Sequence, residues 1–218
     1  LMLAANFDEF ITITTAVALG FPLPYLPIHL LWINLVTDGL PAVALSIDPS
    51  DPDIMKYPPR DPNEDILRRF LKFIVFAALM AYVSNFGLFV YVYEKTLKAT
   101  VNIELAARTA RTMAFTSMVF FELILAYQCR SETKHIFQLG WEGITGNKML
   151  FVSVVVSVVL QLLILYTPLL ADIFHVAPLP PSLLGLCTLG GFSALTVLPG
   201  KLIPKRRYTE HKKTISVA

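Results

Sequence analysis

Six apolar stretches, each about as long as a membrane-crossing helix, constrain the fold of this chain more than any other feature. About 20 apolar residues in a helix cross the hydrocarbon core of a bilayer, where the backbone must satisfy its hydrogen bonds internally. The chain of 218 residues is 55% apolar, with a mean hydropathy of +0.62, which is more apolar than a typical soluble domain. The sequence therefore predicts an all-α membrane protein with six transmembrane helices, at residues 1–20, 27–46, 66–93, 109–128, 149–170 and 182–203.

Basic residues predict the orientation of these helices. Most of the 18 Lys and Arg residues lie in the segments 48–72, 129–148 and 201–213, whereas the turns at 20–27 and 168–182 contain none. Because Lys and Arg concentrate in cytosolic loops, we expect a multi-pass domain at 1–204 and a basic cytosolic tail at 205–218, with both ends in the cytosol. The first stretch starts at Leu1 and includes acidic residues, unlike a signal peptide, so we expect further residues upstream.

Charge and cysteine content exclude several other classes. A formal net charge of only +2 gives no basic excess for binding nucleic acid. The two cysteines, Cys129 and Cys187, form neither a disulfide framework nor a zinc-binding spacing.

The second apolar stretch contains a polar cluster at its middle. Asn34, Thr37 and Asp38 are spaced i, i+3 and i+4, which places them on one face of a helix. Gly39 and Pro41 follow at once and weaken the helix, since glycine lacks a Cβ and proline lacks a donor. Transporters build ion sites from interrupted membrane helices of this kind.

Two other stretches also contain buried carboxylates. Asn6 and Glu9 share a face of the first stretch, Asp8 points elsewhere, and Glu122 lies among apolar residues of the fourth. No Lys or Arg lies deep in any stretch to neutralise these acids, which need either protons or a cation from outside. Carboxylate, amide and hydroxyl oxygens favour a hard cation such as Ca²⁺. The candidate metal ligands are Asn6, Glu9, Asn34, Thr37, Asp38 and Glu122.

A structural explanation competes with this interpretation. Membrane helices use Asn and Thr as hydrogen-bonding contacts between helices, and Thr37 fits that role as well as it fits a ligand role. A lone carboxylate is a poor contact of this kind, so the alternative is weaker for Glu9, Asp38 and Glu122. Asp8 is left open as a proton-titrating or loop-adjacent residue. His29 is expected at the membrane interface.

The motifs resemble those of P-type calcium ATPases of the sarco/endoplasmic reticulum type. The resemblance is strongest for Leu31-Trp-Ile-Asn-Leu-Val-Thr-Asp-Gly-Leu-Pro-Ala42 and Asp53-Ile-Met-Lys-Tyr-Pro-Pro-Arg60, which are similar to the family's sixth membrane helix and the loop after it. Ala5-Asn-Phe-Asp-Glu9 resembles part of the fifth helix, and the segment from Thr112 to Glu122 resembles the eighth. The six stretches would then be helices five to ten.

The resemblance also implies roles in a site for two ions. Glu9 and Asn6 would be ligands from the fifth helix. Asn34 would serve the second ion, Thr37 and Glu122 the first, and Asp38 both. Asp8 departs from the animal pumps, which have a small residue there, and adds a charge that the two-ion scheme does not use.

In this family an aspartyl phosphate drives alternating access and moves Ca²⁺ out of the cytosol. The chain contains no Asp-Lys-Thr-Gly motif, so we expect no catalytic residues here. ATP and Mg²⁺ would be bound by cytosolic domains that, with helices one to four, form the missing N-terminal half of the pump. Loop 48–65 would contact the phosphorylation domain. The alternatives are a pump for Na⁺, K⁺, Mg²⁺ or Mn²⁺, with Asn34 disfavouring the sodium–potassium type, and a non-enzymatic membrane scaffold or channel.

Overall fold

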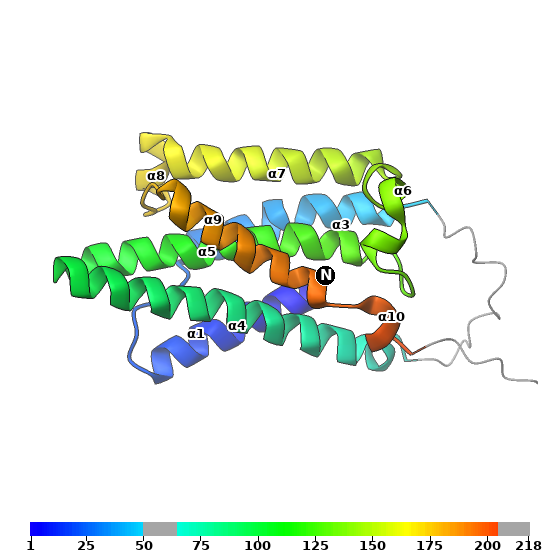
Figure 1. Cartoon of the computed structure of the whole chain (residues 1–218), viewed down its shortest axis with the longest axis horizontal. Helices are drawn as coiled ribbons and strands as arrows, with labels where there is room; N and C mark the ends of the chain where they lie inside the picture. The colour runs from blue at the N-terminus through cyan, green and yellow to red at the C-terminus, as the bar shows by residue number, and fades with distance from the viewer. Residues whose placement is uncertain (50–64, 205–218) are drawn as a thin grey trace, which may run out of the picture.

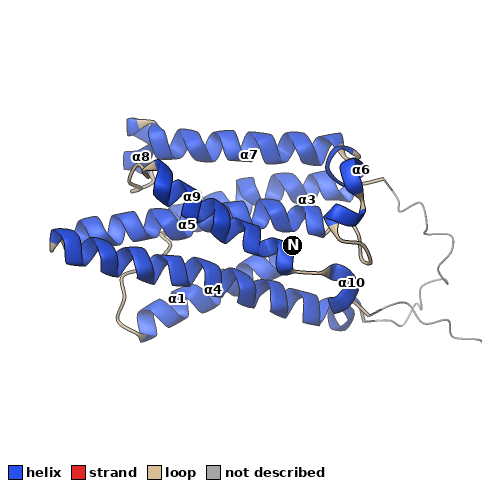
Figure 2. Ribbon diagram, viewed as in Figure 1, coloured by secondary structure: helices blue, strands red, loops and turns tan. Residues whose placement is uncertain are grey.

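The computed structural model describes residues 1–49 and 65–204, and every regular element in that part of the chain is a helix (Figure 2). The predicted all-α class is therefore confirmed. The elements are α1 (Met2–Ala18), α2 (Pro27–Trp32), the π-helical segment η1 (Ile33–Thr37), α3 (Gly39–Ser46), α4 (Ile66–Thr100), α5 (Ile103–Gln128), the 3₁₀ turn η3 (Ile136–Gln138), α6 (Gly140–Thr145), α7 (Lys148–Tyr166), α8 (Pro168–Ile173), α9 (Pro181–Phe192), the 3₁₀ turn η4 (Ser193–Thr196) and α10 (Pro199–Leu202).

Helix α5 is the centre of the bundle. It packs against α3, α4, α7 and α9, which surround it in Figure 1. In its most apolar window 78% of the residues are buried, compared with 39% or less for the other candidate membrane helices. Its large side chains Phe115, Met118 and Phe121 are fully buried. Polar side chains in this window, among them Glu122, are therefore buried among other helices.

Four helical segments among the described residues are long and apolar enough to cross a membrane: Pro27–Ser46, Ile66–Thr100, Ile103–Gln128 and Lys148–Tyr166. The first predicted stretch forms only the 17 residues of α1, which ends just before Gly20 with its left-handed φ of 75°. The sixth forms a shorter apolar helix, Pro181–Thr196, and breaks before Pro199. The described part thus shows an integral membrane bundle with four candidate spans, and the count of six stays a prediction.

Other helix bounds also differ from the predicted ones, at Pro168 and at the turn between α4 and α5. The fifth stretch ends its main helix at Tyr166, because Pro168 disfavours helical geometry in the residue before it and starts the short helix α8. Helix α4 continues to Thr100, past the predicted end at 93. It is capped there by Val101 in the left-handed conformation, and α5 begins at Ile103, before the predicted 109.

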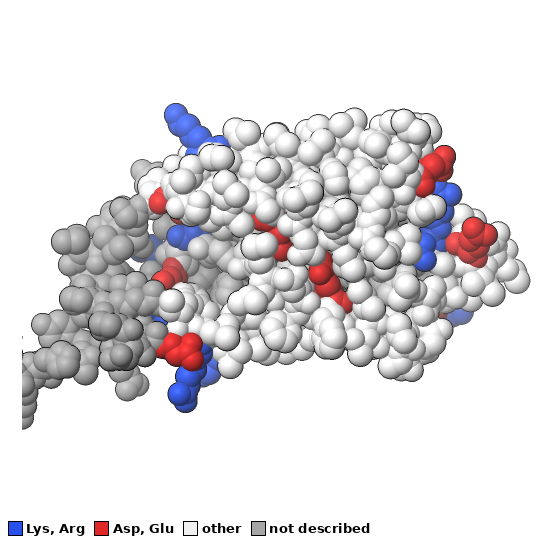
Figure 3. All heavy atoms as spheres, turned by 180° about the vertical axis from the view of Figure 1, so that it is seen from behind, with Lys and Arg blue, Asp and Glu red and all other residues white. Residues whose placement is uncertain are grey.

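Charged residues lie mainly at the two ends of the bundle. The end of α3, the α5–α7 connection with α6, and α10 lie at one end, whereas the turns after α1 and α4 and helix α8 lie at the other (Figure 1). The face in Figure 3 is largely uncharged between the ends, apart from a few acidic side chains at its middle. The predicted basic segments 129–148 and 201–204 therefore share an end with the start of α4. Residues 50–64, which make up most of the predicted loop 48–65, and the predicted tail 205–218 lie outside the described residues.

The close approach of α9 to α5 gives a test of the packing. A Cβ added at Gly191 would lie 2.6 Å from the Cβ of Phe120 and 3.0 Å from its backbone carbonyl carbon, whereas one added at Gly185 would meet nothing within 4 Å. We predict that Gly191→Ala lowers the free energy of unfolding by about 1–3 kcal/mol, because it forces the two helices apart. Thermal unfolding in detergent would measure this.

The matched control is Gly185→Ala, on the same helix. It should leave the unfolding temperature unchanged or slightly higher, since alanine favours a helix over glycine. Equal effects of the two substitutions would contradict the packing of α9 on α5.

Candidate functional site

The second membrane segment is interrupted by a π-helical turn. The Asp38 N–H donates to the carbonyl of Ile33 at 2.9 Å, five residues back, and α3 starts at Gly39. Pro41 has no N–H to offer the carbonyl of Thr37, which weakens the ordinary helical ladder at this point. The predicted interruption is thus present as a π turn just before Gly39, and the chain does not unwind. Such turns often occur at functional sites.

The π turn directs Thr37 toward helix α5. The hydroxyl oxygen of Thr37 lies 2.9 Å from Oε2 of Glu122 and 3.0 Å from the carbonyl oxygen of Ile33. Its single proton can satisfy only one of these acceptors. Both Thr37 and Glu122 are fully buried. Two residues that are 85 positions apart in the sequence therefore meet inside the bundle.

Asn34 is directed toward helix α1. Its amide nitrogen donates to the carboxylate of Glu9, at 3.2 Å from Oε1 and 3.3 Å from Oε2, and to the carbonyl of Leu30 at 3.0 Å. Glu9 is 7% exposed. The polar face predicted for the second stretch is thus divided between two partners, one on α1 and one on α5.

Asp38 lies at the junction of η1 and α3 and is fully buried. Neither of its carboxylate oxygens has a hydrogen-bond partner, and the same holds for Oε1 of Glu122. Asp38 directly follows the π turn whose Asn34 contacts Glu9 and whose Thr37 contacts Glu122. Buried carboxylate oxygens without donors are costly, which is the pattern expected of groups that bind something else.

The carboxylates are not gathered tightly. Among residues 1–49 and 65–204, no group of three or more His, Cys, Asp or Glu side chains is close enough to hold a metal ion together. The structure shows two hydrogen-bonded pairs, Glu9–Asn34 and Thr37–Glu122, with Asp38 unpaired. A cation would have to draw these pairs together, because uncompensated carboxylates repel one another.

Asn6 is placed differently from the other predicted ligands. It is exposed on α1, whereas Glu9 is buried. Residues spaced i, i+3 lie near each other on a helix but not in line, so Glu9 can face the bundle while Asn6 sits at the edge of that face. The structure does not bring Asn6 into either hydrogen-bonded pair.

Asp8 belongs to a separate buried contact between α1 and α4. Its Oδ2 accepts from the amide of Asn85 at 3.0 Å, and its Oδ1 accepts from the hydroxyl of Thr12 at 3.0 Å. Asp8, Thr12 and Asn85 are all fully buried. The loop-adjacent interpretation of Asp8 is therefore wrong, because a residue near the middle of α1 here contacts the middle of α4. The sequence did contain a signal for Asn85, an amide inside a long apolar stretch, but its partner could not be read from spacing.

His29 is likewise buried and takes part in a structural contact. Its ring stacks on Phe115, with centroids 4.5 Å apart. The Nδ1 atom accepts from the N–H of Leu26 at 3.3 Å, and Nε2 lies 2.6 Å from the carbonyl oxygen of Phe174. This fully buried side chain joins α2 to α5 and to the end of α8. Its expected place at a membrane interface stays a prediction.

Comparison with known proteins shows the family to which the chain belongs. The family model described as "Cation transporting ATPase, C-terminus" matches residues 22–202. Calcium-transporting ATPase 1 of Bacillus cereus is 37% identical over 184 residues, which is 80% of this chain and 20% of the relative. Calcium-transporting ATPase of Bacillus subtilis is 34% identical over 211 residues, 94% of this chain and 22% of the relative. Calcium-transporting ATPase type 2C member 2 of Mus musculus is 34% identical over 191 residues, 88% of this chain and 19% of the relative.

These findings define an integral membrane protein of the P-type cation pump class. The chain belongs to the family of cation-transporting ATPase C-terminal regions, and its resemblance to P-type calcium ATPases is confirmed. It spans about a fifth of the length of the curated relatives that it matches. The sarco/endoplasmic reticulum subtype stays a prediction, since these relatives do not specify it.

The contact between Asp8 and Asn85 gives a test of the α1–α4 interface. We predict that Asn85→Leu lowers the free energy of unfolding by about 1–3 kcal/mol, because it leaves the carboxylate of Asp8 buried with one donor fewer. The exchange Asp8→Asn with Asn85→Asp should restore most of the stability, since it keeps one carboxylate and one amide in contact. Thermal unfolding of the purified protein would measure both.

Ser84→Ala provides the neighbouring control, because Ser84 loses only one neutral hydrogen bond, to the carbonyl of Gly190 at 3.1 Å. The Asp8–Asn85 contact would not join the helices if Asn85→Leu cost no more stability than Ser84→Ala. The same conclusion would follow if the double variant Asp8→Asn with Asn85→Asp recovered no stability.

Proposed function

We propose that this chain is the ion-binding membrane part of an ATP-driven pump that moves Ca²⁺ out of the cytosol. The observation that carries the proposal is Asp38, a fully buried carboxylate with no hydrogen-bond donor on either oxygen. It lies at the interruption of a membrane helix, beside the contact between Thr37 and Glu122. The names of the relatives, all calcium-transporting ATPases, favour Ca²⁺ over Na⁺, K⁺, Mg²⁺ or Mn²⁺.

The chemistry of the residues supports a hard cation as the transported substrate. Ca²⁺ takes six to eight oxygen ligands from carboxylates, carbonyls, amides and hydroxyls. Glu9, Asp38 and Glu122 supply carboxylate oxygens, Asn34 an amide oxygen and Thr37 a hydroxyl oxygen. In the structure Asn34 and Thr37 direct N–H and O–H groups at the carboxylates of Glu9 and Glu122. Rotation of these two side chains would present their oxygens to a cation instead.

The proposed division of roles follows the family scheme for two ions. Thr37 and Glu122 would serve the first ion, Asn34 the second and Asp38 both, and Glu9 would serve one of the two. Asn6 would complete the set from α1. Its exposure fits a ligand whose neighbours lie on another part of the pump, since the same face of α1 exposes Phe7 and Phe10, at 50% and 67%.

The exposed apolar face would be covered by the missing N-terminal half. Leu31 on α2 and Leu35 on η1 are exposed as well, at 65% and 67%. In the proposed pump, helices one to four would pack here, and the cytosolic domains would bind ATP and Mg²⁺ and form the aspartyl phosphate. Alternating access would then be driven by differential affinity of the two states for the ion. The six stretches would be helices five to ten, with both ends of the chain in the cytosol.

Asp38→Asn tests the proposal in the full-length pump. We expect Ca²⁺-dependent phosphorylation to be lost, or to need at least about 100-fold more Ca²⁺, because the ligand that would serve both ions loses its charge. The measurement is the Ca²⁺ dependence of phosphoenzyme formation from ATP.

Asp172→Asn is the matched control. Asp172 is a surface carboxylate, 79% exposed, paired with Arg108, and its loss should leave the Ca²⁺ dependence unchanged. Unaltered high-affinity activation in Asp38→Asn would overturn the proposed site. If joint substitution of Glu9, Asp38 and Glu122 impaired only folding, with no ion phenotype in the folded fraction, the scaffold alternative would be favoured.

A further inference from the structure

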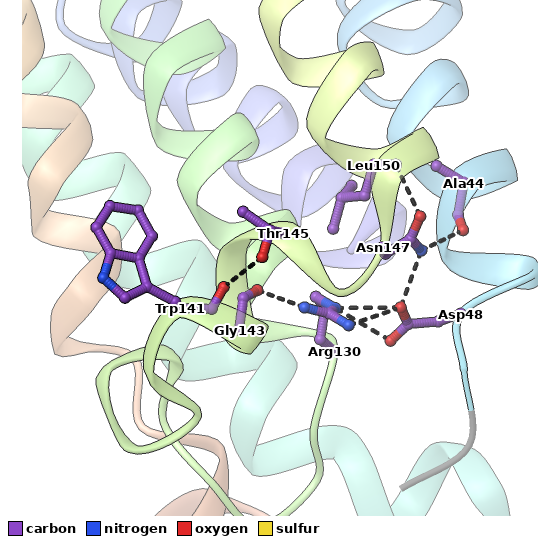
Figure 4. A network of polar contacts seen from close by, with 8 residues as sticks. All are labelled: Ala44, Asp48, Arg130, Trp141, Gly143, Thr145, Asn147 and Leu150. Atoms are coloured by element: carbon purple, nitrogen blue, oxygen red, sulfur yellow. Dashed lines mark hydrogen bonds and ion pairs between the residues drawn. The ribbon is translucent and has the colours of Figure 1, made fainter.

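Asn147 joins the ends of two helices at the end of the bundle that contains α6 (Figure 4). Its Oδ1 caps the start of α7 by accepting from the N–H of Leu150 at 2.9 Å. Its amide nitrogen donates to the carbonyl of Ala44 in α3 at 2.8 Å. The last carbonyls of a helix have no partner within the helix, so a side chain that caps α7 also satisfies the end of α3.

Asp48, just after α3, is held by the same group and by Arg130 (Figure 4). The amide of Asn147 donates to Oδ1 of Asp48 at 2.9 Å. The guanidinium of Arg130 approaches both carboxylate oxygens, with Nε at 3.1 and 3.2 Å and Nη2 at 3.1 Å from Oδ1. Arg130 also donates through Nη1 to the carbonyl of Gly143 in α6. The side chains of Arg130 and Asp48 are only 9% and 14% exposed.

These contacts connect α3 to α5 at a second position along the bundle. Deep in the bundle, Thr37 of η1 contacts Glu122 of α5. At the end of the bundle, Asp48 contacts Arg130, two residues after the end of α5. The eight residues of α3 lie between Asp38 and Asp48 and form a rod of about 12 Å. Because a short helix moves as a rigid element, the position of its end sets the position of Asp38 at its start.

We propose that Asp48, Arg130 and Asn147 form a positioning link that fixes the end of α3 to α5 and α7, and so holds Thr37 and Asp38 in register with Glu122. This rests on the proposed function, since the register matters only if these residues bind the transported cation. The three residues do not touch the ion. They act through α3. Their substitution should lower the affinity for Ca²⁺ without abolishing Ca²⁺ binding.

The experiment compares three single variants in the full-length pump. Arg130→Gln removes the ion pair to Asp48. Asn147→Ser keeps an oxygen that can cap α7 but loses the amide that reaches α3. Arg69→Gln is the matched control: Arg69 is another buried arginine whose ion pair, 2.7 Å to Glu132, joins α4 to the same α5–α6 connection. The readouts are the Ca²⁺ concentration for half-maximal phosphorylation from ATP and the maximal phosphoenzyme level.

We expect Arg130→Gln and Asn147→Ser each to raise the half-maximal Ca²⁺ concentration by about 10-fold, with at least half of the maximal phosphoenzyme kept. Arg69→Gln should change it by less than about 2-fold. Adding Asp48→Asn to Arg130→Gln should raise the half-maximal Ca²⁺ concentration little further, because both residues belong to one link. A general loss of stability would lower the maximal level in all three variants alike and would not distinguish Arg130 from Arg69.

Two results would overturn the link: an unchanged Ca²⁺ dependence in both Arg130→Gln and Asn147→Ser, or an equal change in Arg69→Gln. If Arg130→Gln fails to accumulate as folded protein, Asn147→Ser alone decides, since its cap is retained. Absence of Ca²⁺-dependent phosphorylation in the unmodified pump would instead contradict the proposed function, so the two failures are distinguishable.

Discussion

The burial of carboxylates in an apolar helical bundle is the constraint on which the structure depends. A carboxylate without a partner is expensive in such an interior, and this chain places Asp8, Glu9, Asp38 and Glu122 there. Three of them are held by amide or hydroxyl donors from other residues. Asp38 is the exception. The difference separates an acid that joins α1 to α4, Asp8, from an acid whose oxygens are available to a cation.

Helix α5 is the central helix against which the site is built. It is buried along most of its length and contacts the other long helices. The interrupted segment α2–η1–α3 meets it at Thr37–Glu122, and the end of α3 is held to it through Asp48 and Arg130. The opposite side of that segment, with Leu31 and Leu35, is exposed. The segment is thus held to α5 at two points and to α1 through Asn34 and Glu9, while its other side has no partner among the described residues.

Sequence predicted those features that depend on local periodicity and on residue type. Apolar length gave the helical class, and the carboxylates of Glu9, Asp38 and Glu122 stood out because acids are rare in such stretches. Gly39 and Pro41 predicted an interruption, but they did not predict that it would be a π turn. What the sequence did not reveal is tertiary: the partner of Asp8, the burial of His29 against Phe115, and the exposure of Asn6. None of these can be read from spacing along one helix, because each is decided by a segment far away in the sequence.

In the proposed pump, Asp38 would bind the transported cation together with residues of α1 and α5. A structure of the full-length pump with Ca²⁺, with the ion identified by its anomalous scattering, tests this most directly. We expect an ion about 2.3–2.6 Å from a carboxylate oxygen of Asp38, with Glu122 or Glu9 in the same coordination shell. Saturable Ca²⁺ bound elsewhere in the membrane region, with Asp38 outside every coordination shell, would contradict it.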